Sequence, residues 1–121
     1  GKVLQIKEIN KNEFVGYNQT YKTKKKIKVA ILGIGYADGI SRLLSNKGHV
    51  YYKKKTFNIV GRISMDSITV DISNNDKSLK VGDYMDIINH SNGIDKIAIQ
   101  SNTICHEILT SISKRVKRIY T

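Results

Sequence analysis

The chain has 121 residues, no proline, and 21 basic against 10 acidic side chains, for a formal net charge of +11. This length predicts one domain with a single core, and no apolar run is long enough to cross a membrane, so we expect no membrane partner. The charge favours polyanions, but it comes mainly from short lysine clusters such as 24–26 and 53–55, which are typical of a solvated surface.

Short β-branched runs, each bounded by glycine, asparagine or lysine, predict a mainly β fold. The expected strands cover residues 2–9, 16–21, 26–33, 50–52, 57–63, 67–72 and 84–88. Their spacing indicates a small β-barrel-like domain.

The period changes near the C-terminus. Ile94, Ile97 and Ala98 recur at helical spacing, with Ser91 or Asn92 available as the N-cap. A second short helix or turn is expected over 104–112 and a last strand over 114–120. We therefore expect one domain over 1–121, with one or two short helices near its C-terminus and no internal boundary.

Cysteine and histidine carry little chemistry in this sequence. Cys105 is the only cysteine, which suits a reducing, cytoplasmic compartment and a buried thiol. His49, His90 and His106 are scattered without ligand spacing, so we expect no metal site. The chain begins at Gly1 without an initiator methionine, and we expect it to be part of a longer protein.

Four blocks of sequence carry the functional information: VGYNQTY at 15–21, IGYADG at 34–39, VGRISMD at 60–66, and EILT at 107–110 with RVKRIY at 115–120. In this order and spacing they resemble the C-terminal domain of alanine racemase, a pyridoxal-phosphate enzyme. The resemblance covers nearly the whole chain. It implies that an N-terminal α/β barrel, which carries the lysine bound to the cofactor, precedes this domain and is absent from the chain.

Tyr17 has the most direct mechanistic meaning under this resemblance. Racemisation at an amino-acid α-carbon needs one acid/base on each face of a planar carbanion, while pyridoxal phosphate supplies the electron sink. The resemblance implies that the cofactor lysine serves one face and Tyr17 the other. A half-buried tyrosine on a strand is the structural alternative.

Met65 lies in the third block. The resemblance implies that its backbone N–H binds the substrate carboxylate, and the alternative is a core methionine. Asp66 matches the same motif, and we assign it no catalytic role.

Three residues are implied to line the substrate entrance: Tyr36, Arg42 and Arg62. A cationic corridor would attract an amino-acid carboxylate. Asp38, in the glycine-flanked turn after Tyr36, is expected to form the turn through its side chain.

His106 is where the sequence departs from the family pattern. The family usually has tyrosine at this position, close to the cofactor phosphate. A histidine also donates a hydrogen bond, so we expect His106 either to contact the phosphate or to be structural.

The leading hypothesis is therefore an isomerase domain that acts in L-alanine/D-alanine interconversion, for D-alanine and peptidoglycan synthesis. The resemblance implies a homodimer in which Tyr17 and Met65 act on an amino-acid substrate in the partner's pyridoxal-phosphate site. We expect the isolated domain to be inactive. A racemase of broader specificity, or a related decarboxylase, is a neighbouring possibility.

The alternative hypothesis is a basic β-barrel module that binds nucleic acid. It depends on charge and fold class, with Tyr51, Tyr52 and Phe57 as stacking candidates beside Lys53–Lys55. We expect nucleic acid not to be the partner.

Overall fold

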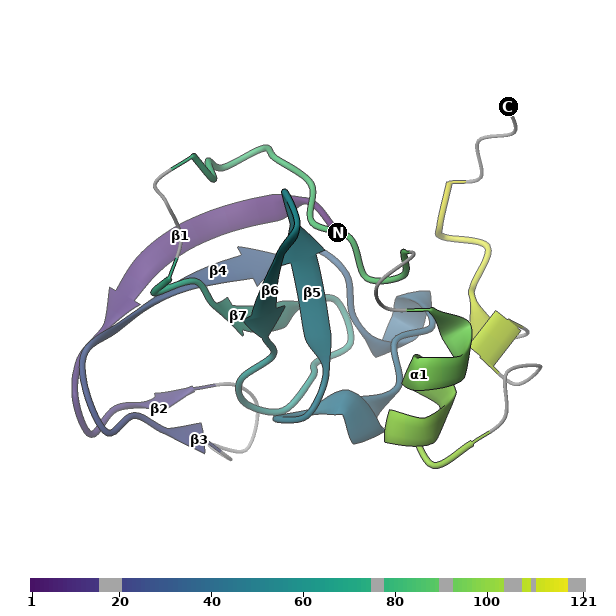
Figure 1. The fold of residues 1–121 in the computed structure, drawn as a ribbon, viewed down its shortest axis with the longest axis horizontal. Helices are drawn as coiled ribbons and strands as arrows, with labels where there is room; N and C mark the ends of the chain where they lie inside the picture. Colours follow the sequence, from purple (N-terminus) through teal and green to yellow (C-terminus); the bar gives the residue numbers. More distant parts are fainter. Residues whose placement is uncertain (16–20, 75–77, 90–92, 104–107, 110, 118–121) are drawn as a thin grey trace.

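The computed structural model describes residues 1–15, 21–74, 78–89, 93–103, 108–109 and 111–117 (Figure 1). Its strands, two 3₁₀ helices and one α-helix within these ranges confirm the predicted mainly β fold. In chain order they are β1 (Val3–Ile9), β2 (Phe14–Val15), β3 (Tyr21–Lys22), β4 (Ile27–Leu32), η1 (Tyr36–Asp38), η2 (Arg42–Leu44), β5 (His49–Tyr52), β6 (Lys55–Asn58), β7 (Ile68–Asp71) and α1 (Ile94–Gln100). No helix in these ranges is long and apolar enough to span a membrane.

The strands pair as an antiparallel sheet in the order β1-β4-β7 and as two hairpins, β2–β3 and β5–β6. Isolated bridges connect these units at Lys2–Tyr84, Tyr51–Asp86 and Ile59–Val70. Among the described residues the strands do not form one closed barrel, so the predicted barrel-like closure is not confirmed.

The central strand β4 is apolar on both faces because it lies between two hydrophobic clusters. Ile27 and Val29 belong to a small cluster with residues of β1 and β2. Ala30 and Leu32, on the opposite face, belong to the main core. The strand predicted over 26–33 is therefore confirmed as β4, and it leads at Leu32 into the segment that carries η1.

The β2–β3 hairpin lies at one end of the molecule and α1 at the other (Figure 1). The two 3₁₀ helices lie at the α1 end, since Tyr36 and Arg42 line the same cavity as Ser101, which follows α1. The turns that hold the second and third sequence blocks are thus gathered at one end of the β structure.

Two predicted strands are shorter than expected. The strand over 57–63 ends at Asn58, and Gly61 has a left-handed φ of 77° that an extended strand does not accommodate. Over 84–88 only isolated bridges form, because Tyr84 pairs with Lys2 whereas Asp86 pairs with Tyr51. Successive residues thus meet different strands, and no continuous ladder results.

The C-terminal predictions are partly correct. Helix α1 is confirmed, but its N-cap is Gly93, without a side-chain cap hydrogen bond, whereas Ser91 and Asn92 lie outside the described residues. Of the described residues of the second predicted helix, Ile108, Leu109 and Ser111 are helical, whereas Ile112 is not.

The predicted last strand is wrong over its described part, because residues 114–117 form a turn. Ser113 causes it: its hydroxyl accepts from the Arg115 N–H at 3.1 Å, and its carbonyl accepts from the Val116 N–H at 3.2 Å. These local bonds replace a sheet ladder.

Candidate active-site face

Tyr36 begins the 3₁₀ helix η1 immediately after β4. The Gly35 N–H donates to Asp38 Oδ2 at 2.9 Å, and Asp38 is buried. Gly39 ends the helix in the left-handed region, with φ of 110°, and its N–H donates to the Tyr36 carbonyl at 3.1 Å. The prediction that Asp38 forms the turn is confirmed.

The loop that carries Met65 packs directly against this turn. The Tyr36 N–H donates to the Ser64 carbonyl and the Ala37 N–H to the Met65 carbonyl, each at 3.0 Å. A Cβ on Gly35 would lie 2.5 Å from the Met65 carbonyl oxygen and closer still to that of Ser64. Only glycine allows this approach, so Gly35 fixes how closely Tyr36 and Met65 lie.

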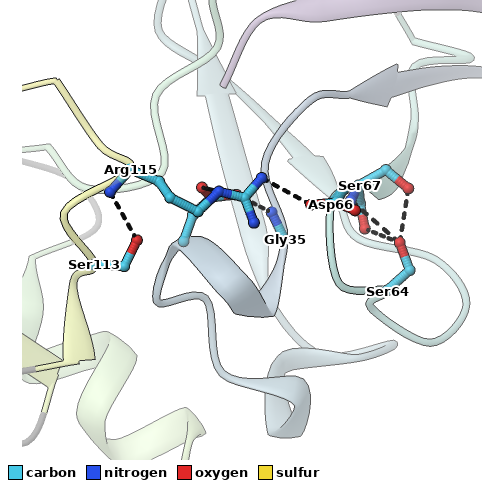
Figure 2. Close-up of polar contacts among 7 residues, drawn as sticks. Gly35, Ser64, Asp66, Ser67, Ser113 and Arg115 are labelled. Atoms are coloured by element: carbon cyan, nitrogen blue, oxygen red, sulfur yellow. Dashed lines mark hydrogen bonds and ion pairs between the residues drawn. The ribbon is translucent and has the colours of Figure 1, made fainter.

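The loop is closed on itself by two serines. The Ser64 N–H donates to the Ser67 carbonyl at 3.1 Å, and the Ser67 N–H donates to Ser64 Oγ at the same distance. The two hydroxyls are 2.8 Å apart (Figure 2). The Met65–Asp66 pair therefore lies at the tip of a short hydrogen-bonded turn.

Tyr36, Arg42, Ser64 and Met65 line one cavity of about 340 Å³. The Arg42 guanidinium carbon lies 5.5 Å from the Tyr36 ring centroid, at cation–π distance. Tyr36 is 41% exposed and Met65 52% exposed, so Met65 is not the core methionine of the structural alternative. A cavity lined by a phenol and a guanidinium suits a small anionic ligand such as a carboxylate.

The Met65 backbone has its two polar groups in different situations. Its carbonyl accepts from Ala37, whereas its N–H has no acceptor within the part of the chain that the structure describes. An amide donor at an exposed loop tip is available to a ligand. The Met65 N–H can therefore donate to a carboxylate, which is the role that the family resemblance implies for it.

Arg62 does not line this cavity. Its neighbours are bound to the turn after η2: the Gly61 N–H donates to Asn46 Oδ1 at 2.6 Å, and the Ile63 N–H donates to Ser45 Oγ at 2.9 Å. Ser45 Oγ donates in turn to the Arg42 carbonyl at 2.6 Å. Hydrogen bonds thus connect the backbone segments that carry Arg42 and Arg62. No contact between the two arginine side chains is found among the described residues.

Arg115 reaches the same face from the C-terminal segment. Its Nη2 lies 2.7 Å from Asp66 Oδ1 and its Nε 3.3 Å from Asp38 Oδ1. The hydrogen bond to Asp66 and the charge of Asp38 raise the pKa of Arg115 above its ordinary value, so it stays charged. Sequence reasoning used Arg115 only as part of the fourth block.

The remaining two site predictions, Tyr17 and His106, lie outside the described residues, as does Cys105. No three histidine, cysteine or acidic side chains gather as metal ligands do within the described ranges.

The stacking surface required by the nucleic-acid alternative does not form. Tyr51 is 7% exposed and Phe57 3%; Phe57 belongs to the main core, whereas Tyr51 lies on the other face of the β5–β6 hairpin. Tyr52 is half-buried, with the Lys53 ammonium 5.3 Å from its ring centroid. Buried rings cannot stack on bases, so Tyr51 and Phe57 do not provide the stacking surface that this alternative requires.

Comparison with known proteins identifies the family. The model of the family described as alanine racemase, C-terminal domain, matches residues 1–120. The chain is 39% identical over 118 residues to an alanine racemase of Aquifex aeolicus, which covers 98% of this chain and 34% of that protein. It is 44% identical over 122 residues to an alanine racemase of Clostridium perfringens, which covers 98% of this chain and 31% of that protein.

Solved structures agree with the sequence comparison. An alanine racemase from Bartonella henselae with covalently bound pyridoxal phosphate superposes with a TM-score of 0.95 and 46% identity, over 99% of this chain and 33% of that one. The biosynthetic alanine racemase of Pseudomonas aeruginosa superposes with a TM-score of 0.91 and 28% identity, over 99% and 33%. The chain spans about a third of the length of these relatives. It therefore belongs to the alanine racemase family, in which it corresponds to the C-terminal domain.

Proposed function

We propose that this chain acts in an alanine racemase, an isomerase that interconverts L- and D-alanine with pyridoxal phosphate. In this proposal the domain covers the cofactor site on the α/β barrel of a partner subunit, so that the active enzyme is a homodimer. The observation that carries the proposal is the cavity on which Tyr36, Arg42 and Met65 converge. Tyr36 and Met65 come from two separate sequence blocks, and the chain matches the family model over residues 1–120.

The cofactor would be held elsewhere. The cavity is lined by Tyr36, Arg42, Ser64 and Met65 and contains no lysine, so it does not fit as the anchoring site of pyridoxal phosphate. We therefore assign the anchoring lysine to a preceding domain, consistent with relatives about three times as long as this chain. When bound there, the cofactor supplies the electron sink for the substrate carbanion.

The substrate carboxylate would bind on this chain. The exposed Met65 loop offers an N–H donor without an acceptor among the described residues, and Arg42 adds positive charge in the same cavity. A carboxylate that accepts from an amide beside a guanidinium is both oriented and stabilised. Tyr36, Arg42 and Arg62 are the proposed entrance residues.

Tyr17 is the proposed acid/base on the second face of the α-carbon. Its phenolate would take the α-proton from one enantiomer, and in the reverse reaction its phenol would return a proton to the same face of the α-carbon. An unperturbed phenol has a pKa near 10, so cationic or hydrogen-bonding neighbours on the partner's barrel would have to stabilise its phenolate. His106 is the proposed contact to the cofactor phosphate.

The test of this proposal is Tyr17→Phe in the full-length protein that carries this domain. The variant should keep the fold and the cofactor but lose proton transfer on one face, which corresponds to about 10²–10⁴-fold in rate. Exchange of the α-proton with solvent deuterium should fall far more for one alanine enantiomer than for the other. Tyr84→Phe, at a tyrosine that is 68% exposed, is the matched control and should behave as the parent does.

Two results would contradict the proposal. Equal, small losses for both enantiomers would make Tyr17 a structural residue. A parent protein that binds single-stranded DNA tightly at physiological salt, and does not racemise alanine, would favour the nucleic-acid alternative.

A further inference from the structure

Arg115 joins two carboxylates, Asp38 of the Tyr36 turn and Asp66 of the Met65 loop, and Figure 2 shows its contact with Asp66. We propose that Arg115 is a positioning residue, which holds the Met65 loop against the Tyr36 turn and thereby aims the Met65 N–H at the substrate carboxylate. This inference rests on the proposed function for the identity of the ligand. The clamp itself is a property of this chain.

The contact pattern uses the shape of the guanidinium. Nη2 donates to Asp66 Oδ1 at 2.7 Å, while Nε lies 3.3 Å from Asp38 Oδ1. A planar fork with donors on different edges can serve two separate carboxylates at once, whereas a lysine ammonium is a single point charge. Lysine at this position would therefore replace only one of the two contacts.

Each carboxylate lies in the same turn as a residue that lines the cavity, Asp38 with Tyr36 and Asp66 with Met65. Asp66 is the covalent neighbour of Met65, so its position constrains the orientation of the preceding peptide unit. Asp38 ends η1, and its second oxygen accepts from the Gly35 N–H at 2.9 Å. Asp38 is only 9% exposed, and a carboxylate that is nearly buried needs a compensating cation. Arg115 supplies that cation, and the same guanidinium also contacts Asp66 in the Met65 loop.

The segment that presents Arg115 is itself fixed. The Ser113 N–H donates to the Asp38 carbonyl at 3.2 Å, and the Arg115 N–H donates to Ser113 Oγ at 3.1 Å. The backbone before Arg115 is thus bound to η1, while its side chain spans to the Met65 loop. Three segments far apart in sequence meet at one guanidinium.

The expected effect is moderate because the Arg115 side chain is 51% exposed. Ion pairs of this exposure typically change an equilibrium by about 5-fold or less. Loss of the clamp should weaken carboxylate binding equally in the ground state and the transition state, which raises KM and leaves kcat unchanged. A direct role in proton transfer would instead lower kcat.

The kinetic test uses the full-length protein with Arg115→Ala, Arg115→Lys and Asp66→Asn. We expect KM for alanine to rise about 5-fold in Arg115→Ala and in Asp66→Asn, about 2-fold in Arg115→Lys, and kcat to stay within about 2-fold of the parent. The inhibition constant of propionate, which keeps the carboxylate of alanine without its amino group, should rise in parallel. Lys26→Ala removes an equally exposed ion pair, with Glu8, at the start of β4 and should leave KM unchanged.

A second measurement separates the clamp from the proposed function. In hydrogen–deuterium exchange followed by mass spectrometry, peptides that cover 61–67 should exchange faster in Arg115→Ala than in the parent, with Arg115→Lys between them and Lys26→Ala like the parent.

Three outcomes would contradict parts of the inference. If Arg115→Ala leaves exchange over 61–67 unchanged, Arg115 does not hold the Met65 loop and the clamp is overturned. If exchange rises but KM and the propionate constant do not, the carboxylate role is overturned. If the parent does not racemise alanine at all, the proposed function and the carboxylate role fail together, while exchange still decides the clamp.

Discussion

The β1-β4-β7 sheet and the candidate active-site face, formed by the turns at 35–39 and 61–67, are stabilised by different forces. In the sheet, β4 buries apolar side chains on both faces, and the free energy comes from area removed from water. On the active-site face, the turns at 35–39 and 61–67 are stabilised by hydrogen bonds with fixed directions, such as those of Asp38 and Ser64. Apolar packing tolerates small shifts, whereas directed polar contacts determine where a single N–H points. The region that needs accurate geometry is the one built from polar contacts.

Two exposed ion pairs illustrate the same difference. Lys26 and Glu8, at 2.8 Å, join the start of β4 to β1, two strands whose backbones are already paired. Among the described residues, Arg115 joins segments that individual hydrogen bonds connect and that no strand pairing connects. We therefore expect loss of the Lys26–Glu8 ion pair to have little effect on the sheet, and loss of the Arg115 ion pairs to have a larger effect on the candidate site.

The sharpest way to break the active-site face is Gly35→Ala. The φ of Gly35 is −151°, which any residue adopts, so the cost is purely steric. The new methyl group would lie 2.6 Å from the Met65 carbonyl carbon, and backbone atoms cannot move aside as a flexible side chain does. We expect a loss of about 1–3 kcal/mol in the free energy of unfolding, together with faster hydrogen exchange over 61–67.

Gly93→Ala is the matched control for that substitution. Gly93 is the N-cap of α1, with φ of −69°, and a methyl group added there would have no atom within 4 Å apart from its own chain neighbours. Its cost should stay below about 1 kcal/mol, since only N-cap preference is affected. Urea unfolding followed by circular dichroism measures both, and an equal loss at the two glycines would show that the close approach at Gly35 is not limiting.

Sequence reasoning located the strands well where apolar residues alternate. Strand β4 lies within the predicted range 26–33, because its apolar, largely β-branched residues are bounded by lysine and glycine. The prediction from the sequence failed where local polar contacts or backbone conformation override the apolar pattern. Gly61 ends the pairing that Phe57 and Ile59 suggest, and Ser113 forms a turn in place of the last strand.

The candidate site was only partly readable from the sequence. Tyr36, Arg42 and Met65 were named through the family resemblance, and their shared cavity appears only in three dimensions. Arg115 was missed because its partner Asp66 is 49 positions away and no local pattern connects them. The available signal was Asp38: a carboxylate in a glycine-flanked turn between apolar segments, which needs a cation from elsewhere in the chain.

The β5–β6 hairpin contains backbone strain at its turn, away from the candidate site, so relieving this strain should change stability without changing catalysis. Its two-residue turn places Lys53 at φ of 49° and Lys54 at φ of 67°, the left-handed conformation that a type I′ turn requires and lysine disfavours. Lys54→Gly should therefore raise the free energy of unfolding by about 0.5–1 kcal/mol without changing KM. Lys55→Gly removes the same charge from the adjacent strand position and should lower stability by about 0.5–1 kcal/mol. Urea unfolding of the two variants tests the sign, and a destabilised Lys54→Gly variant would contradict the strain argument.

The smallest effect is expected at the sheet ion pair, and its pH dependence has a definite sign. The hydrogen bond from Lys26, followed by its charge, lowers the pKa of Glu8 below its ordinary value. A lowered carboxyl pKa in the folded state contributes stability above the unfolded pKa, and that contribution is lost as pH falls through the folded pKa. Glu8→Gln should therefore melt slightly below the parent at pH 7, and the difference in Tm should disappear once the pH lies below the folded pKa of Glu8. Both the protonated carboxyl and the amide then lack a charge to pair with Lys26, so a Tm difference that persists or grows on acidification would show that Glu8 contributes through packing and not through its charge.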